Sequence, residues 1–238
     1  MKKAIVIGAT SGIGRAIAKL LVENNYKVGV TGRRLELLED LRAENESAYI
    51  IKSFDVTDIK STIDNLEQLS IELGGVDLII VSSGTGYEND NLEFELEKQT
   101  IDTNITGFTC VVDWAFNFFQ KQKFGHLAAI SSVGGLRGSW QAPAYNATKA
   151  YQINYLEGLR QKAAKLGKTI FVTDLRPGFV DTKMAKGDGL FWVMPVDKAA
   201  KQIYDAVVKK KTVAYITRRW AIIALTLNLL PKSIYDKI

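Results

Sequence analysis

Short runs of apolar and β-branched residues recur along this chain of 238 residues, and segments with helical periodicity separate them. Residues 4–7 and 78–81 are apolar without alternation, as expected of strands that are buried on both faces of a parallel sheet. Strands are predicted at residues 3–8, 27–31, 48–53, 77–81, 126–131, 169–175 and 212–216. Strands that alternate with helices form right-handed βαβ units, so the sequence predicts an α/β fold. We expect a Rossmann-like, doubly wound parallel sheet of about seven strands, with helices on both faces.

Length and composition fit one domain of this kind. Apolar residues make up 47% of the chain and charged residues 24%, as in an ordinary globular protein. No linker rich in Pro, Gly or Ser divides the sequence, so residues 1–238 are expected to form one nucleotide-binding domain. Gly8 ends the first apolar run too early for an export signal, and the single cysteine, Cys110, suits a reducing compartment. These features predict a cytoplasmic location and a buried, chemically silent Cys110.

A glycine-rich segment, Gly8-Ala9-Thr10-Ser11-Gly12-Ile13-Gly14, joins the first predicted strand to the first predicted helix. Glycines let the backbone approach a pyrophosphate, and the free N–H groups at the helix start then neutralise it. The spacing GxxxGxG differs from the common GxGxxG, and a purely structural tight turn is the alternative. The position between strand and helix favours a phosphate-binding loop made by Gly8, Thr10, Ser11, Gly12, Ile13 and Gly14.

Two arginines, Arg33 and Arg34, follow the second predicted strand, where an NAD site would place an acid for the ribose hydroxyls. Guanidinium groups pair with phosphate oxygens, so the two arginines favour the 2′-phosphate of NADP(H) over NAD(H). Solvated loop arginines are the alternative, and Glu36 lies close enough to weaken the distinction.

Asp55 and Val56 follow the third predicted strand at the same edge of the sheet. The Asp55 carboxylate either accepts a hydrogen bond from the adenine amino group of the cofactor or caps a helix that begins near Thr57. Both interpretations fit the sequence equally.

Tyr145 and Lys149 are four residues apart in a helical segment that continues through Leu159, so they share one helical face. The pKa of a free phenol is roughly 10, and a nearby ammonium stabilises the phenolate. Ser132 lies at the end of the fifth predicted strand, at the edge where parallel sheets hold ligands. A YxxxK pair by itself is also typical of a helix surface, but together with Ser132 and the glycine loop it predicts an acid–base site.

Together GxxxGIG, the strand-end serine and YxxxK resemble the short-chain dehydrogenase/reductase family, over essentially the whole chain. The resemblance implies an oxidoreductase that interconverts a carbonyl and an alcohol by hydride transfer, and the two arginines make NADP(H) its expected cofactor. In that family Tyr145 would be the general acid and base, Ser132 would polarise the carbonyl, and Lys149 would hold the nicotinamide ribose while lowering the pKa of Tyr145. Asn104 would complete a water-linked proton relay. An inward position beside water would also explain an Asn in the middle of a helix, where it is disfavoured.

The resemblance covers two further segments. Residues 177–182 look like the nicotinamide-binding turn, in which Pro177, Gly178, Val180 and Thr182 would contact the nicotinamide; a plain loop is the alternative. The chain departs from the family pattern at Ile7, where Thr is usual, and at residues 81–84, where Asn-Asn-Ala-Gly is usual. Ser82, Ser83 and Gly84 are still expected to line the adenosine ribose. The family also implies a homodimer or homotetramer.

Two segments near the C-terminus carry the substrate and partner predictions. Residues 183–195 hold two glycines beside Leu190, Phe191 and Trp192, so they are predicted to form a lid over an apolar or amphipathic substrate. Core packing is the alternative for those residues. Residues 218–238 form an apolar and basic helical extension. Its apolar run, residues 220–230, has eleven residues and is too short to span a bilayer, which takes roughly 20 residues. It covers a subunit interface, lies on a membrane surface or pads the lid.

Charge and histidine content exclude several functions. The net charge is +5, but the segment from Asp197 onward holds nine Lys or Arg against three Asp, which is +6 and leaves −1 for residues 1–196. Such a local excess does not predict a nucleic-acid partner. His126 is the single histidine, so neither a histidine-containing catalytic triad nor a metal site is predicted. The alternative to an enzyme is an NADP-binding sensor or scaffold without turnover, which would not need Ser132, Tyr145 and Lys149 together.

Overall fold

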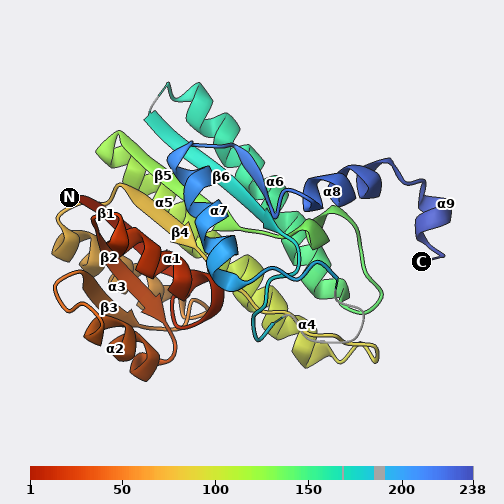
Figure 1. The fold of residues 1–238 in the computed structure, drawn as a ribbon, viewed down its shortest axis with the longest axis horizontal. Coiled ribbons are helices and arrows are strands. Elements are labelled where there is room, and N and C mark those ends of the chain that lie inside the picture. Colours follow the sequence, from red (N-terminus) through yellow and green to blue (C-terminus); the bar gives the residue numbers. More distant parts are fainter. Residues whose placement is uncertain (168, 185–190, 238) are drawn as a thin grey trace.

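The computed structural model describes residues 1–167, 169–184 and 191–237, and in these ranges seven parallel strands form one sheet in the order β3-β2-β1-β4-β5-β6-β7. The strands are β1 (Lys2–Ile7), β2 (Tyr26–Gly32), β3 (Tyr49–Ser53), β4 (Leu78–Val81), β5 (Phe124–Ile130), β6 (Thr169–Pro177) and β7 (Val213–Ile216). Each predicted strand is present, with ends within two residues of the prediction. The predicted Rossmann-like doubly wound sheet is therefore confirmed (Figure 1).

Helices cover both faces of this sheet. One face packs against α1 (Gly12–Glu23), α2 (Leu35–Ala43) and α7 (Val196–Val208), and the other against α3 (Ile59–Leu73), α5 (Phe108–Gln122) and α6 (Pro143–Lys165). The remaining helices are α4 (Phe94–Ile101), the π-helical turn η1 (Asp102–Gly107), the short 3₁₀ helix η2 (Val133–Leu136), α8 (Trp220–Leu229) and α9 (Lys232–Tyr235). None of the described helices combines the length and the apolar character needed to cross a bilayer.

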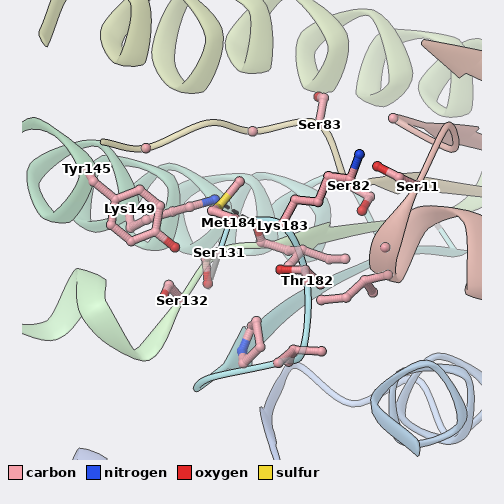
Figure 2. A pocket seen from close by; sticks show the side chains of 18 of the residues that line it. Ser11, Ser82, Ser83, Ser131, Ser132, Tyr145, Lys149, Thr182, Lys183 and Met184 are labelled. Atoms are coloured by element: carbon pink, nitrogen blue, oxygen red, sulfur yellow. Dashed lines mark hydrogen bonds between the residues drawn. The ribbon is translucent and has the colours of Figure 1, made fainter. Parts of the chain in front are cut away.

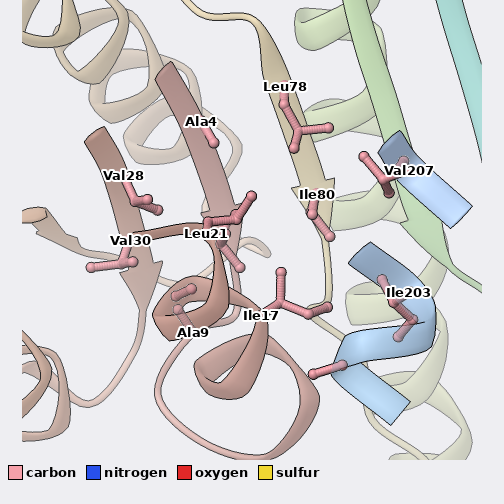
Figure 3. Packing of buried hydrophobic residues seen from close by; sticks show 14 of the residues in the cluster. Ala4, Ala9, Ile17, Leu21, Val28, Val30, Leu78, Ile80, Ile203 and Val207 are labelled. Atoms are coloured by element: carbon pink, nitrogen blue, oxygen red, sulfur yellow. The ribbon is translucent and has the colours of Figure 1, made fainter. Parts of the chain in front are cut away.

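Successive residues of each strand enter different cores. In β1, Ala4 packs on the side of α1 and Ile5 on the side of α3 and α5. Figure 3 shows the first of these cores, where Ile17 and Leu21 of α1 lie against the sheet and Ile203 of α7 lies nearby. Burying an aliphatic side chain of this size contributes about 1.5–3 kcal/mol. Because both faces are covered, the central strands are apolar throughout, which explains why the sequence pattern identified them.

The strand order reverses between β1 and β4, and this is where an open α/β sheet leaves a crevice at its C-terminal edge. Gly8 follows β1 with a φ of +86°, a conformation that favours glycine. A Cβ at Gly8 would lie 2.7 Å from the backbone N of Ser83, which follows β4. The two loops therefore meet backbone to backbone at the floor of the crevice.

Candidate active site

A cleft of about 1060 Å³ opens at the C-terminal edge of the sheet. The loops after β1, β2, β3, β4, β5 and β6 all contribute to its walls. The predicted site residues that line it are Gly8, Thr10, Ser11, Gly12, Ile13, Arg33, Arg34, Asp55, Val56, Ser82, Ser83, Gly84, Ser132, Tyr145, Lys149, Pro177, Gly178, Val180 and Thr182. Gly14 and Asn104 lie behind the described lining rather than in it. Figure 2 shows Ser11 and Ser82 at one end of the cleft, with Tyr145 and Lys149 at the other.

The glycine loop brings the start of α1 to the cleft without side chains in between. A Cβ at Gly14 would lie 2.1 Å from the carbonyl oxygen of Gly8, so glycine is required for α1 to begin against the loop. A Cβ at Gly12 would lie 3.2 Å from Cγ2 of Thr182 and would fill the space between this loop and the turn after β6. The N-cap residue Ser11 makes no side-chain capping bond, which leaves the first N–H groups of α1 available to an anion.

Two cations stand beside this helix start. Nη2 of Arg34 donates hydrogen bonds to Oγ1 of Thr10 at 2.6 Å and to Oγ of Ser11 at 2.9 Å. Arg33 is largely exposed and pairs with the Asp55 carboxylate at 3.4 Å. Glu36 lies in the first turn of α2 and outside the described lining of the cleft. This end of the cleft is therefore rich in positive charge.

Two further cations at this end, Arg15 and Lys19, were not predicted from the sequence. Both line the cleft, and both pair with Glu44, at 3.2 Å and 2.7 Å. Their spacing of four residues in the first turns of α1 was a signal that could have identified them.

Asp55 lines the cleft but does not cap the following helix. Its Oδ1 accepts hydrogen bonds from N and Oγ1 of Thr57, at 3.0 and 2.9 Å. Burial raises the pKa of Asp55, but these two bonds and the Arg33 guanidinium lower it below its ordinary value. Helix α3 begins at Ile59, and its cap is Asp58, which accepts from the backbone N of Ser61 at 3.0 Å. The interpretation of Asp55 as the helix cap was wrong.

Tyr145, Lys149 and Ser132 come together at the other end of the cleft (Figure 2). Nζ of Lys149 lies 5.7 Å from the centroid of the Tyr145 ring and donates hydrogen bonds of 3.0 Å to the carbonyl oxygen of Ile130 and to Oε1 of Gln152. Burial lowers the pKa of Lys149 to about 8, against the opposing charge of Asp174. Burial likewise raises the pKa of Tyr145, and a hydrogen bond with Ser132 opposes that rise.

The ring of Tyr145 lies against Gly86, which the sequence reasoning missed. A Cβ at Gly86 would lie 2.4 Å from Cδ2 of Tyr145. A Cβ at Gly84 would lie 3.5 Å from Nζ of Lys149 and 3.3 Å from Oδ1 of Asn104. The loop after β4 thus leaves room for the phenol and ammonium by using glycine at alternate positions, and that spacing was visible in the sequence.

Asn104 is fully buried in the π-helical turn η1 rather than in a regular helix. Its side chain accepts from the backbone N of Thr85 at 2.9 Å and donates to Oγ1 of Thr148 at 3.0 Å. Its carbonyl oxygen accepts from Nε2 of Gln152 at 2.9 Å. Gln152 therefore joins Asn104 to Lys149. This residue was missed, although it lies one turn after Lys149 on α6.

A buried carboxylate, Asp174 of β6, fixes the end of β5 next to Ser132. Asp174 is fully buried, and one of its oxygens pairs with Nε of Arg176 at 2.6 Å. The other oxygen accepts a hydrogen bond from the hydroxyl of Ser131. A charge at this depth requires such partners. The pairing of β5 with β6 brings Ser131 and Asp174 together, and no local pattern in the sequence indicated this contact.

Aromatic rings form the wall next to the turn after β6. The Trp220 ring stacks on Phe191 with centroids 5.2 Å apart and meets Phe179 edge-on at 5.3 Å. A Cβ at Gly178 would lie 1.9 Å from Cε2 of Trp220, so glycine allows the indole to lie on the turn. Phe191 also meets Trp192 edge-on.

The predicted lid is described only in part. Lys183, Met184 and Phe191 line the cleft, whereas Gly187, Gly189 and Leu190 lie outside the described residues. The segment is joined to the turn after β6 by hydrogen bonds between the backbones of Met194 and residues 179 and 181. Next to the serine loop, Gln141 lines the cleft, while Trp140 is 68% exposed and outside its described lining.

His126 and Cys110 lie away from the cleft. His126 is buried and shares a 2.8 Å hydrogen bond with Oγ1 of Thr173, and burial together with the charge of Lys210 lowers its pKa to about 4. Cys110 is partly rather than fully buried, and burial raises the pKa of its thiol. In the described part of the chain, no group of three His, Cys, Asp or Glu residues is placed to hold a metal ion.

Known proteins resemble this chain in sequence and in structure. A family model described as short chain dehydrogenase matches residues 2–189. An uncharacterised oxidoreductase of Myxococcus xanthus is 29% identical over 242 residues, which cover 99% of this chain and 95% of that protein. An uncharacterised oxidoreductase of Staphylococcus aureus is 35% identical over 186 residues, which cover 76% of this chain and 79% of that protein.

Two solved structures are similar as well. A short-chain dehydrogenase from Streptomyces avermitilis superposes with a TM-score of 0.85 and 25% identity, covering 99% of this chain and 94% of the other. A variant of actinorhodin polyketide ketoreductase, crystallised with NADPH, superposes with a TM-score of 0.71 and 29% identity, covering 77% of this chain and 72% of the other.

Proposed function

The chain belongs to the short-chain dehydrogenase family, and we propose that it is an NADP(H)-dependent oxidoreductase that interconverts a ketone or aldehyde and an alcohol. The observation that carries the proposal is the meeting of Tyr145, Lys149 and Ser132 at one end of a cleft whose other end holds a glycine loop and arginines. The relatives compared above are named oxidoreductases, and one similar solved structure carries NADPH.

The residues at the adenosine end fit NADP(H). The uncapped start of α1 supplies N–H groups for a pyrophosphate, next to glycines that keep side chains out of the way. Arg34 and Arg33 would hold the 2′-phosphate, since a guanidinium pairs well with phosphate oxygens. Asp55 would accept from the adenine amino group. Arg34 is fixed by two hydrogen bonds to the glycine loop, so its positive charge is held beside the start of α1.

The chemistry follows from the groups at the other end. The bound cofactor supplies the hydride for reduction, or accepts it for oxidation. The Ser132 hydroxyl donates a hydrogen bond to the carbonyl oxygen of the substrate and so polarises the bond. The Tyr145 phenol gives its proton to that oxygen, which completes the alcohol and leaves a phenolate. Lys149, 5.7 Å from the ring centroid, stabilises the phenolate by its charge.

The supporting residues hold Lys149 in that position. Two hydrogen bonds, to Ile130 and Gln152, fix the ammonium, and Gln152 is itself fixed by Asn104. We propose that Asn104 acts in this way, as a positioning residue for Lys149. The water-linked relay through Asn104 stays a prediction.

The substrate end favours an apolar or amphipathic carbonyl compound. This end of the cleft is lined by the apolar side chains of Phe179, Met184, Phe191, Trp220 and Leu227. Pockets with this lining hold ligands mainly by apolar burial, with a few polar groups to orient them. The described parts of the predicted lid, residues 183–184 and 191–195, would cover such a substrate and exclude water during hydride transfer.

The direct test is NADPH oxidation with a panel of apolar aldehydes and ketones, comparing the wild type with Tyr145→Phe. Removing the phenol hydroxyl removes the proton donor, so kcat should fall by about 10²-fold or more. Tyr151→Phe, on the same helix and hydrogen-bonded to Thr109, is the matched control and should keep its activity. Activity retained by Tyr145→Phe would refute the role of Tyr145. A wild type that binds NADPH without turnover would instead indicate a sensor or scaffold.

A further inference from the structure

Helix α8 is apolar on both sides, but only one side is covered. Trp220 and Ala224 are buried against the body of the protein. Ile222, Leu225 and Leu229 are 66%, 60% and 73% exposed, and their spacing places them on one helical face. A helix that is apolar all round is normally buried. These three residues therefore form an apolar stripe that lacks a partner within the described chain.

The stripe is held in place and is not part of a loose tail. Nε of Arg137 donates to the carbonyl oxygen of Leu227 at 2.8 Å, and its Nη2 donates to that of Leu230. The same guanidinium lies 5.3 Å from the ring centroid of Tyr235 in α9, whose hydroxyl donates to the carbonyl oxygen of Gly138 at 2.5 Å. The loop after η2 thus fixes α8 and α9 where they extend from one end of the molecule (Figure 1).

Positive charges flank the stripe at both ends. Arg218 and Arg219 precede α8, Lys232 and Lys237 follow it, and all four are exposed. With Asp236 as the one acid, residues 218–237 carry a net charge of +3. Within the described residues, none of these cations makes an ion pair of 4.0 Å or less.

An anionic lipid surface complements this pattern better than a second copy of the chain does. Cations beside an apolar helical face attract acidic headgroups while the apolar side chains enter the headgroup region. A two-fold contact between two stripes would instead bring the flanking cations of the two copies close together, and these cations would repel one another. We propose that α8 and α9 dock on an anionic lipid surface through Ile222, Leu225 and Leu229.

Other exposed apolar side chains extend the surface. Ile234 of α9 is 50% exposed, and Trp140 is 68% exposed in the loop whose Gly138 binds Tyr235. Tryptophan is enriched at the boundary between membrane and water, where its ring lies at headgroup level. Trp140, which is not among the described residues that line the cleft, would therefore contact the lipid headgroups.

Docking would place the substrate end of the cleft beside the lipid. Trp220 and Leu227 of α8 line the cleft on the covered side of the same helix. Apolar carbonyl compounds dissolved in the membrane would then reach the cleft over a short path. This consequence rests on the proposed function, whereas the docking itself does not.

The test is flotation of the full chain with vesicles, without cofactor or substrate, so its result is independent of the proposed activity. The wild type should float with vesicles of phosphatidylcholine and phosphatidylglycerol, less so as salt is raised, and not with phosphatidylcholine vesicles. The triple variant Ile222→Ser, Leu225→Ser, Leu229→Ser should bind the acidic vesicles at least about tenfold more weakly than the wild type. Ile71→Ser, at a residue 77% exposed on α3, is the matched control and should bind like the wild type.

Three results would overturn the proposal. The wild type fails to float with acidic vesicles, the triple variant floats as well as the wild type, or light scattering shows that the triple variant splits a wild-type oligomer into monomers. The last result would assign the stripe to an interface between copies. Circular dichroism verifies that the variants fold, and Arg218→Ser with Lys232→Ser, which leaves the stripe intact, should weaken binding to acidic vesicles through charge.

Discussion

Replacing Lys149 with methionine should change how the stability of the protein depends on pH. Lys149 is 4% exposed, and burial lowers its pKa from the ordinary 10.5 to about 8. In the unfolded chain the ammonium keeps its proton up to its ordinary pKa. Between these two values the unfolded state binds more protons than the folded state, so the free energy of unfolding rises with pH in this window.

The magnitude follows from the two pKa values. One pKa unit corresponds to about 1.36 kcal/mol, so lowering the pKa from 10.5 to about 8 amounts to about 3 kcal/mol. Below pH 8 the fold carries this cost in full, because the charged side chain is buried. Lys149→Met removes the titration and leaves a constant difference from the lost hydrogen bonds to Ile130 and Gln152.

Urea unfolding of both proteins at a series of pH values is the assay. The stability of Lys149→Met relative to the wild type should fall by about 3 kcal/mol between pH 7 and pH 10.5, because the wild type gains stability as Lys149 loses its proton. Taking the difference cancels the other groups that titrate in both proteins. Lys165→Met, an exposed lysine on the same helix, controls for the loss of a charge. A difference that stays constant with pH would show that the pKa of Lys149 is the same in the folded and the unfolded chain.

Three further changes test other parts of the site. Gly86→Ala places a Cβ 2.4 Å from Cδ2 of Tyr145, so the Tyr145 ring must move. Steady-state kinetics should show a kcat at least about tenfold lower, while titration shows an unchanged affinity for NADPH. Normal turnover would contradict the contact. Asp174→Asn leaves Arg176 without its buried counter-ion, and urea unfolding should show a loss of about 3–5 kcal/mol, whereas unchanged stability would argue against the pair. Arg33→Asp should abolish tighter binding of NADPH than of NADH in fluorescence titrations, because a carboxylate repels the 2′-phosphate; equal affinities in the wild type would overturn the cofactor assignment.

The strands and the main site segments were predictable because their signals are local. A strand covered on both faces is apolar at successive positions, as in residues 4–7, and this holds whatever packs on it. Tyr145 and Lys149 share a face because of helix geometry. The glycine loop follows its strand directly, and glycine at Gly14 is required by a contact only six residues away.

The parts that were missed depend on contacts between distant segments. Gln152 bonds to Asn104 across 48 residues, and Asp174 bonds to Ser131 across 43, so no window of sequence contains both partners. The cap of α3 shows a different difficulty. Asp55 and Asp58 are both suitable residues near the helix start, and the backbone conformation decides that Asp58 caps the helix while Asp55 faces the cleft.

In the proposed reaction, a hydride passes from NADPH to a carbonyl carbon while Tyr145 supplies the proton. NADPH that carries deuterium at the transferred position, incubated with an apolar ketone, tests this directly by mass spectrometry of the alcohol. The wild type should give an alcohol with one deuterium on the carbinol carbon, and Tyr145→Phe should give almost none. Alcohol without deuterium, or equal labelling by both proteins, would contradict the account.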